Sequence, residues 1–388
     1  MQSNNIPVHK EIVLVGGGHA HALLIRQWGM QPLPGVRLTL VSPAPNTPYS
    51  GMLPGLIAGH YSFEELHIDL VKLCHWAGMR FICSEVTGLD PASQQVTLKD
   101  QSALAYDVLS INTGSTPDDS VPGVAEHAIP IKPIAGFWQS WQQLREQLER
   151  TDEQLRITVV GGGAGSVEAI LAMAWSCRNN RSIHQAPVFQ LVSQGAEILS
   201  GYPRQVRRAA EQACQELDIH IETSFSVIQV TKDRLISAED KHLACDQVIW
   251  CAQAGAPDWP TESGLACTED GFVEVNEFLQ SSSHDSIFAA GDVAHMIKSP
   301  SPKAGVYAVR QAPVLFNNLC NYSMLKPLLP YRPKDKFLSL LTLGGKVATG
   351  NRGSLSISGK WVWRWKDRID RKFMGRFQSL VRNGSNES

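Results

Sequence analysis

The sequence predicts an α/β fold with two similar halves, each built around a parallel sheet. Each half opens on a short apolar strand, a glycine-rich turn and an apolar helix, with the turns at residues 16–18 and 161–163. A strand-end glycine follows the first glycine of each turn at similar spacing, 98 residues on at Gly114 and 94 residues on at Gly255. This matched order is typical of a duplicated architecture.

The composition is that of an ordinary globular chain that is too long for one compact core. Its 388 residues predict two or three domains, and 43% hydrophobic with 19% charged residues is usual for such a chain. A net charge of -2 argues against a nucleic-acid partner. Eight scattered cysteines without a CxxC pair fit a reducing compartment. No apolar run approaches the roughly 18 residues that span a bilayer, and the first strand begins near residue 11. We therefore expect a cytoplasmic location without a signal peptide.

The first half has the pattern of a dinucleotide site, with two departures. A strand at 12–15 meets the turn, and a helix at 20–28 and a strand at 36–41 follow. In this arrangement backbone N–H groups approach a pyrophosphate at a helix N-terminus. Ser42 stands where an acidic residue usually binds the ribose. His21 replaces the third glycine, which predicts a helix set slightly further from the strand. His19 and His21 lack a third ligand nearby, so we expect no metal.

The rest of the first half consists of a stiff loop and a series of shorter elements. Residues 43–59 form an apolar, proline-rich loop, which is either the wall of a pocket for a flat ring or a packed surface loop. The pattern then predicts a helix at 63–77, strands at 80–84, 95–99 and 106–111, and a polar helix at 136–150.

The second half repeats this order, after which the chain returns to the first half. Predicted elements are a strand at 156–160, helices at 167–175 and 205–217, and strands at 188–192, 219–222, 227–231 and 245–250. A strand at 287–290 and a helix at 306–319 then rejoin the first sheet. We expect one domain from 1–125 and 256–330, a second domain inserted at 126–255, and a small C-terminal α+β region at 331–388.

The C-terminal region ends in a cationic segment with one apolar stripe. Strands are predicted at 337–342 and 346–349, and a helix at 360–381. The stripe consists of Val362, Trp365, Ile369, Phe373, Phe377 and Leu380. This pattern is typical of an interfacial helix on an anionic membrane, or of one that docks a protein partner. A helix that packs the stripe on its own domain is the equal alternative.

Five segments in this order resemble one group of flavoproteins. VGGGHAH, DVLSINTGS, VVGGGAGSVE, DQVIWCAQAG and IFAAGDVA resemble the two-dinucleotide enzymes of the pyridine nucleotide-disulfide oxidoreductase superfamily, over about residues 10–320. YSGMLPGLIAGHYS, PKAGVYAVRQ and the basic tail resemble a subfamily found fused to or beside selenide, water dikinase. That subfamily is related to type II NADH dehydrogenases and sulfide:quinone reductases. The resemblance implies two Rossmann-like domains, one for FAD and one for NAD(P)H.

The resemblance also implies a role for each matching position. FAD would be held by Gly16, Gly18, His19, Ala20, Ser42, Thr113, Gly114, Gly291 and Asp292. NAD(P)H would be held by Gly161, Gly163, Ala164, Ser193 and Gly255. The implied catalytic residues are Glu168 at the nicotinamide–flavin junction, Lys303 with the helix start near Gly305 beside reduced flavin, and Gln311 on the acceptor side. Glu168 as a capping carboxylate and Lys303 as a surface charge are the structural alternatives.

The choice between NADH and NADPH stays open in the sequence. Ser193 ends the second strand of its half without the usual acid. Arg204, Arg207 and Arg208 could reach a 2′-phosphate, but they lie on a predicted helix and could be solvated.

The implied function is that of an FAD-dependent NAD(P)H oxidoreductase. It would pass a hydride to flavin and electrons to a quinone or small acceptor, with a link to selenium metabolism. Thiol relay is not expected, because that chemistry needs a cysteine pair beside the flavin. The alternative is an FAD-binding coupling or sensory module that docks a partner such as selenophosphate synthase. The C-terminal helix is a second open question, because the sequence does not decide whether it contacts the cytoplasmic face of a membrane.

Overall fold

The computed structural model describes residues 7–117, 120–252, 254–333 and 337–380, and it contains two five-stranded parallel sheets. The first has the order β21-β9-β1-β2-β5, and the second has the order β11-β18-β12-β13-β14. The first sheet consists of β1 (Lys10–Val15), β2 (Val36–Ser42), β5 (Arg80–Cys83), β9 (Val108–Ile111) and β21 (Ile287–Ala289). The second consists of β11 (Ala128–Pro130), β12 (Arg156–Val160), β13 (Val188–Val192), β14 (Ile219–Glu222) and β18 (Gln247–Trp250). The two Rossmann-like sheets confirm the predicted fold class.

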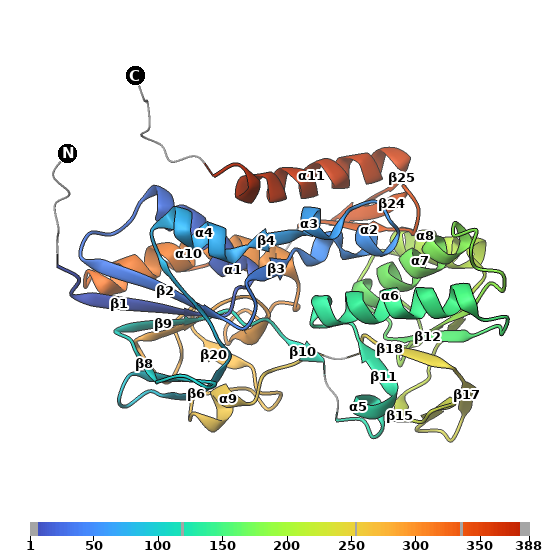
Figure 1. The fold of residues 1–388 in the computed structure, drawn as a ribbon, viewed down its shortest axis with the longest axis horizontal. Coiled ribbons are helices and arrows are strands. Elements are labelled where there is room, and N and C mark those ends of the chain that lie inside the picture. The colour runs from blue at the N-terminus through green and yellow to red at the C-terminus, as the bar shows by residue number, and fades with distance from the viewer. Residues whose placement is uncertain (1–6, 118–119, 253, 334–336, 381–388) are drawn as a thin grey trace.

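The central strands of both sheets are buried on their two faces, which explains their continuous apolar sequences. In β1 the residues from Ile12 to Val15 are at most 2% exposed, as expected for parallel strands covered by helices. In the first half, α4 (Leu70–Ala77) packs against β5, and α1 (His19–Met30) packs against both α4 and α10 (Gly305–Ser323). The strands of the second sheet contact three helices, which are α6 (Ile134–Arg150), α7 (Ala164–Arg178) and α8 (Arg204–Glu216). Figure 1 shows the two halves side by side.

The helix predicted at 63–77 is wrong, because the chain breaks there into three elements. They are α3 (Phe63–Leu66), β4 (His67–Asp69) and α4. Ser62 and Glu65 form a capping box at the start of α3, and Asp69 caps α4 by accepting from the Lys72 N–H. β4 meanwhile pairs with β3 (Asn46–Pro48). Two N-cap residues within eight positions indicate two separate helix starts, although the apolar spacing is that of one continuous helix.

The chain crosses between the halves twice, and the two crossing segments pair with each other. β10 (Thr116–Pro117) lies antiparallel to β19 (Ala254–Gly255). All strands of the second sheet lie between these crossings in sequence, whereas β21 joins the first sheet after the return. The exact domain limits at 125/126 and 255/256 stay a prediction.

Short elements complete the two halves. Two antiparallel sheets consist of β6 (Val86–Asp90), β7 (Gln95–Leu98) and β8 (Leu104–Ala105), and of β15 (Val227–Val230), β16 (Arg234–Ser237) and β17 (His242–Ala244). The remaining pieces are η1 (Ser50–Met52), α2 (Leu53–Ile57), α5 (Val124–His127), α9 (Trp259–Glu262), β20 (Val273–Val275), η2 (Gly291–Val293) and β22 (Ala294–Met296).

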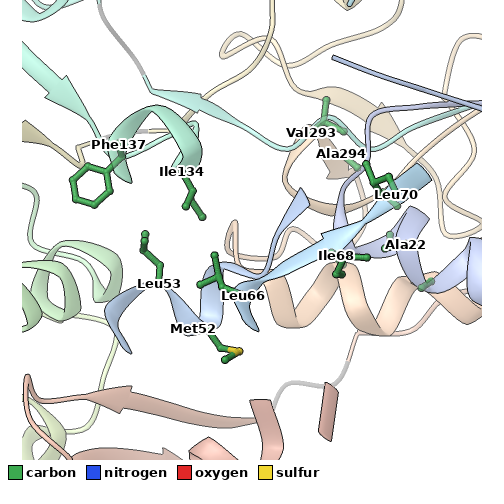
Figure 2. Packing of buried hydrophobic residues seen from close by; sticks show 14 of the residues in the cluster. Ala22, Met52, Leu53, Leu66, Ile68, Leu70, Ile134, Phe137, Val293 and Ala294 are labelled. Carbon is green, nitrogen blue, oxygen red and sulfur yellow. The ribbon is translucent and has the colours of Figure 1, made fainter. Parts of the chain in front are cut away.

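One apolar core runs from the first half into the second. Leu53 of α2 points toward Ile134 and Phe137 of α6 (Figure 2), and none of the three is more than 7% exposed. Leu53 belongs to the proline-rich loop, so that loop packs between the halves. Burial of such side chains, at about 25 cal/mol per Å² of apolar surface, stabilises the contact.

The C-terminal region covers both halves (Figure 1). β23 (Leu338–Thr342), β24 (Ala348–Arg352) and β25 (Leu355–Gly359) form an antiparallel sheet, and α11 (Lys360–Gln378) follows directly. The sequence prediction missed β25. The hairpin between β23 and β24 meets α7, where Gly344 is so close that a Cβ there would lie 2.7 Å from the Leu171 carbonyl oxygen.

The buried face of α11 is rotated relative to the predicted apolar stripe. Val362, Phe373 and Phe377 are at most 6% exposed, but Trp365 and Ile369 are 41% and 39% exposed. Lys366 and Asp370 take their place in the buried face. The helix therefore packs on its own chain, as one alternative stated, and presents part of the stripe to the surface.

Candidate functional site

The first glycine turn is held closely against the end of β9. Gly16 has φ 90°, and a Cβ there would lie 2.6 Å from the Asn112 carbonyl oxygen, so that only glycine fits. The Gly18 N–H donates to the same oxygen at 3.1 Å. The turn thus places the start of α1 at the carboxyl edge of the sheet, where ligands of parallel sheets bind.

Asn112 is a residue that sequence reasoning missed. Its Oδ1 accepts from the N–H groups of Ala20 at 3.1 Å and His21 at 3.2 Å, and its Nδ2 donates to the Ala290 carbonyl at 2.6 Å. One buried amide therefore caps α1 and joins the ends of β9 and β21. An amide directly after an apolar strand was the available signal, because a buried polar side chain needs partners.

His21 is a core histidine. Its ring is fully buried, with Nδ1 2.7 Å from the Gly16 carbonyl oxygen and Nε2 2.8 Å from Ser110 Oγ. Burial lowers its pKa to about 4, against the raising effect of the Gly16 carbonyl. The imidazole fills the space beneath the turn as a neutral, bonded group, and both ring nitrogens are thereby occupied.

The proposed flavin-side residues gather around this turn. Ser42 is buried, with Oγ 3.3 Å from where a Cβ on Gly17 would lie. Gly114 has φ 82° with open space at its Cβ position, and Thr113 is exposed beside it. Asp292 Oδ2 accepts from Lys132 Nζ at 3.2 Å, across the two halves. Open backbone, a helix N-terminus and a carboxylate are the groups that FAD requires, so these residues fit it.

Gln311 and Lys303 both support the segment around Asp292. Gln311 is 4% exposed, and its Oε1 accepts from the Gly291 N–H at 2.7 Å. Lys303 Nζ donates to the Ala294 carbonyl at 2.9 Å and lies 3.6 Å from the Phe272 ring centroid. Desolvation lowers the pKa of Lys303 to about 8, although Asp292 opposes the shift. Lys303 is therefore a partly buried cation rather than a surface charge.

The N-terminus of α10 meets His19 of the first turn. A Cβ on Gly305 would lie 3.3 Å from His19 Nδ1, while Nε2 of the same ring is 3.1 Å from the Pro48 carbonyl oxygen. The ring is 5.4 Å from Tyr49 and 6.3 Å from Phe373 of α11. Burial lowers the pKa of His19. The proline-rich loop and α11 thus close over the first turn.

The second glycine turn opens into a cavity of about 490 Å³, a volume usual for ligand sites. Gly161, Gly163 and Ser193 line it. Gly161 has φ 138°, and a Cβ on Gly162 would collide with the Ser193 side chain. Ala164 begins α7 directly after the turn. Gly255 lies in the crossing strand β19, and Cys251 at the end of β18 lines the cavity.

Glu168 faces the C-terminal sheet. Its Oε1 accepts from the Thr342 N–H at 2.7 Å and from Thr342 Oγ1 at 2.9 Å. Burial raises its pKa, while nearby Lys366 opposes the shift and Asp370 adds to it. The carboxylate therefore bonds a strand of another region, which differs from the capping alternative.

A buried ion pair on α11 links this carboxylate to the first half. Lys366 Nζ is 2.8 Å from Asp370 Oδ2 and donates to the Gly51 carbonyl at 2.6 Å. The Tyr49 hydroxyl donates to Asp370 Oδ1 at 3.2 Å. Burial raises the pKa of Asp370 against the lowering effect of Lys366. We propose that this cluster, with Glu168, forms the wall between the two nucleotide sites, which the sequence alone did not reveal.

The cysteines are not paired with one another in this structure. All eight lie in the described residues and are free thiols. Burial raises the pKa of Cys251 to about 12, so this thiol is a poor nucleophile.

Two glycine turns on two parallel sheets, with partly buried charges between them, define a flavoprotein oxidoreductase that acts on nicotinamide nucleotides. The family model described as pyridine nucleotide-disulphide oxidoreductase matches residues 10–312, and the chain belongs to this family. It is an enzyme that uses FAD and NAD(P)H.

Three similar proteins are distant in sequence, but each match covers most of this chain. A demethylphylloquinone reductase from Synechocystis is 24% identical over 353 residues, which are 87% of this chain and 86% of that protein. The sulfide:quinone oxidoreductase structure from Aquifex aeolicus has a TM-score of 0.80 and 19% identity, and the match covers 97% of this chain and 93% of that one. NDH2 from Plasmodium falciparum, in complex with NADH, has a TM-score of 0.79 and 16% identity, with 96% and 100% covered.

Proposed function

We propose that this enzyme passes reducing equivalents from NAD(P)H through FAD to a quinone at a membrane surface. FAD supplies the two-electron chemistry when bound. The observation that carries the proposal is the cluster of Glu168, Lys366, Asp370 and Tyr49, which joins both halves and α11 and in which Lys366 and Asp370 are buried. The names of the reductase from Synechocystis and the oxidoreductase from Aquifex aeolicus support a quinone as acceptor.

The charged side chains of the site would each have a different role. Lys303, whose Nζ lies between the Ala294 carbonyl and the Phe272 ring, would stabilise negative charge with the N-terminus of α10. Lys132 and Asp292 would hold the two halves together beside FAD. Glu168, with its raised pKa, would hold a proton at Oε2 near the nicotinamide side, because Oε1 accepts hydrogen bonds from Thr342. α11 would exclude water from this wall.

The exposed face of α11 supports a membrane contact. Trp361, Trp365 and Ile369 are 56%, 41% and 39% exposed and lie four residues apart along the helix. Arg364 and Arg368 lie between them on exposed positions. Tryptophan and basic residues on one exposed helical face suit the interface of an anionic bilayer. Among the described helices, none is long and apolar enough to span a bilayer.

Anaerobic mixing of the FAD-loaded protein with NADH, and separately with NADPH, tests the redox function. We expect the flavin absorbance to bleach with at least one nucleotide and to return when a soluble quinone is added. Bound flavin that neither nucleotide bleaches would refute the proposal and support the coupling-module alternative. The link to selenium metabolism and to selenophosphate synthase has the sequence resemblance as its support, and pull-down of that synthase would test it.

Sedimentation with vesicles tests the membrane contact. We expect binding to vesicles that contain anionic lipid, and its loss in a variant with Trp361, Trp365 and Ile369 changed to serine. Leu325→Ser is the matched control, because Leu325 is 90% exposed on the first half. Equal binding of both variants would remove α11 from the contact. Substitution is preferable to truncation here, since the buried face of α11 is part of the core.

A further inference from the structure

We propose that Glu197 makes the second nucleotide site select NADH over NADPH. This inference rests on the proposed function, because it names the nucleotide for the same site. Ser193 leaves the end of β13 without its usual acid, and Glu197 supplies the carboxylate from the loop that follows.

The loop after β13 folds back over the glycine turn. The Leu199 N–H donates to the Gly162 carbonyl at 2.7 Å, and the Ser224 N–H donates to the Gly195 carbonyl at 2.9 Å. These bonds bring Glu197 into the wall of the same 490 Å³ cavity that the second glycine turn lines. The adenosine ribose of a dinucleotide lies beyond the second strand of such a half. Glu197 is therefore placed where a ribose hydroxyl would meet it.

The charge of this wall disfavours a 2′-phosphate. Among the described residues that line the cavity, Glu197 is the one that carries a charge. A carboxylate accepts a hydrogen bond from a ribose 2′-hydroxyl, but it repels a phosphate of nearly two negative charges. Like charges placed together at a binding site suppress the wrong partner.

Glu197 also engages the arginine that would otherwise favour NADPH. Arg207 on α8 forms an ion pair with Glu197, and its side chain is 20% exposed. Its guanidinium is thus held by the carboxylate. Arg204 and Arg208 lie on exposed positions of the same helix. Of the three arginines that could reach a 2′-phosphate, the one beside the cavity is already paired.

Binding of nucleotide fragments to the FAD-loaded protein tests this inference without any redox step. Calorimetry with ADP-ribose and with 2′-phospho-ADP-ribose gives the ratio of their dissociation constants. We expect ADP-ribose to bind at least about tenfold more tightly at low salt, and the ratio to narrow as salt screens the repulsion.

Three variants separate the carboxylate from the arginines. Glu197→Gln should remove the repulsion and free Arg207, so the ratio should fall to about one or invert. Arg207→Gln should keep or widen the preference for ADP-ribose, because the carboxylate remains. Arg181→Gln is the matched control and should leave the ratio unchanged, because Arg181 is exposed beyond the C-terminal end of α7, away from the glycine turn. Circular dichroism and retained FAD show that each variant is folded.

Several results would overturn the inference. These are equal or tighter binding of the phosphorylated fragment to the wild type, absence of binding by both fragments, and a Glu197→Gln ratio equal to that of Arg181→Gln. The proposed function fails in a different way, when the flavin is bleached by neither nucleotide although ADP-ribose binds. The two failures are therefore distinguishable.

Discussion

Replacement of Lys366 by methionine would leave a buried carboxylate without its cation. The Lys366 and Asp370 side chains are 9% and 5% exposed, and their charged atoms are 2.8 Å apart. Breaking such a pair from one side typically costs about 3–5 kcal/mol, because the remaining charge stays desolvated. The Gly51 carbonyl would lose its 2.6 Å bond as well. We expect α11 to be destabilised by about 3 kcal/mol or more.

Hydrogen–deuterium exchange of the α11 amides measures this loss locally. A change of about 3 kcal/mol corresponds to roughly a hundredfold faster exchange if the helix opens as a unit. The double variant Lys366→Met with Asp370→Met should recover most of the protection, because no unpaired charge is then left buried. Loss of the Tyr49 contact to Asp370 would leave a residual cost of about 1 kcal/mol.

The pH dependence gives an independent check with a definite sign. Burial raises the pKa of Asp370, and Lys366 opposes that shift. Without Lys366 the folded-state pKa rises further, so the protonated acid is favoured in the fold and its stabilising contribution is lost as pH rises. The deficit of Lys366→Met relative to the wild type should therefore shrink as pH falls from 7 toward 5. A deficit below about 1 kcal/mol, or one equally large in the double variant, would refute the reasoning.

Three further predictions concern the flavin side. Asn112→Ala leaves two N–H groups of α1 and the Ala290 carbonyl unpaired, which should cost about 3 kcal/mol and increase FAD loss on dilution, measured by free-flavin fluorescence. His21 has a folded-state pKa of about 4, so its neutral form stabilises the fold at neutral pH. That contribution, up to about 3 kcal/mol, falls as pH drops from 6.5 to 4 and should be absent from the unfolding curves of His21→Gln. Burial lowers the pKa of Lys303 to about 8, so the flavin midpoint potential should show an inflection near that pH that Lys303→Met lacks. Below that pH the variant should have the lower potential, because it lacks the cation; identical potentials in both proteins would remove Lys303 from the site.

The proposed function gives the two faces of α11 different roles. Its inner face carries Lys366 and Asp370 into the wall between the halves, and its outer face carries the tryptophans. In the proposed function, one amphipathic helix would therefore close the redox site with its inner face and contact a membrane with its outer face. The vesicle and exchange experiments address the two faces separately.

The local patterns of the sequence were sufficient for the architecture. A short apolar strand followed by glycines has few backbone solutions, and the positive φ of Gly16 and Gly161 shows why those positions need glycine. The same reasoning placed both turns, the return to the first sheet at residue 287 and the start of the last helix at residue 360. That helix was predicted to end at residue 381, which lies outside the described residues, whereas α11 ends at Gln378. It failed at 63–77, where caps override a continuous helical spacing.

Tertiary structure decided which side chains meet, because those contacts join segments far apart in the chain. Lys366 bonds Gly51, and Glu168 bonds Thr342. The orientation of α11 about its axis was also decided by tertiary packing, since Lys366 and Asp370 are buried while Trp365 of the apolar stripe is 41% exposed. A one-dimensional pattern records which residues share a face, whereas the desolvation and pairing of charges depend on what the fold places opposite that face.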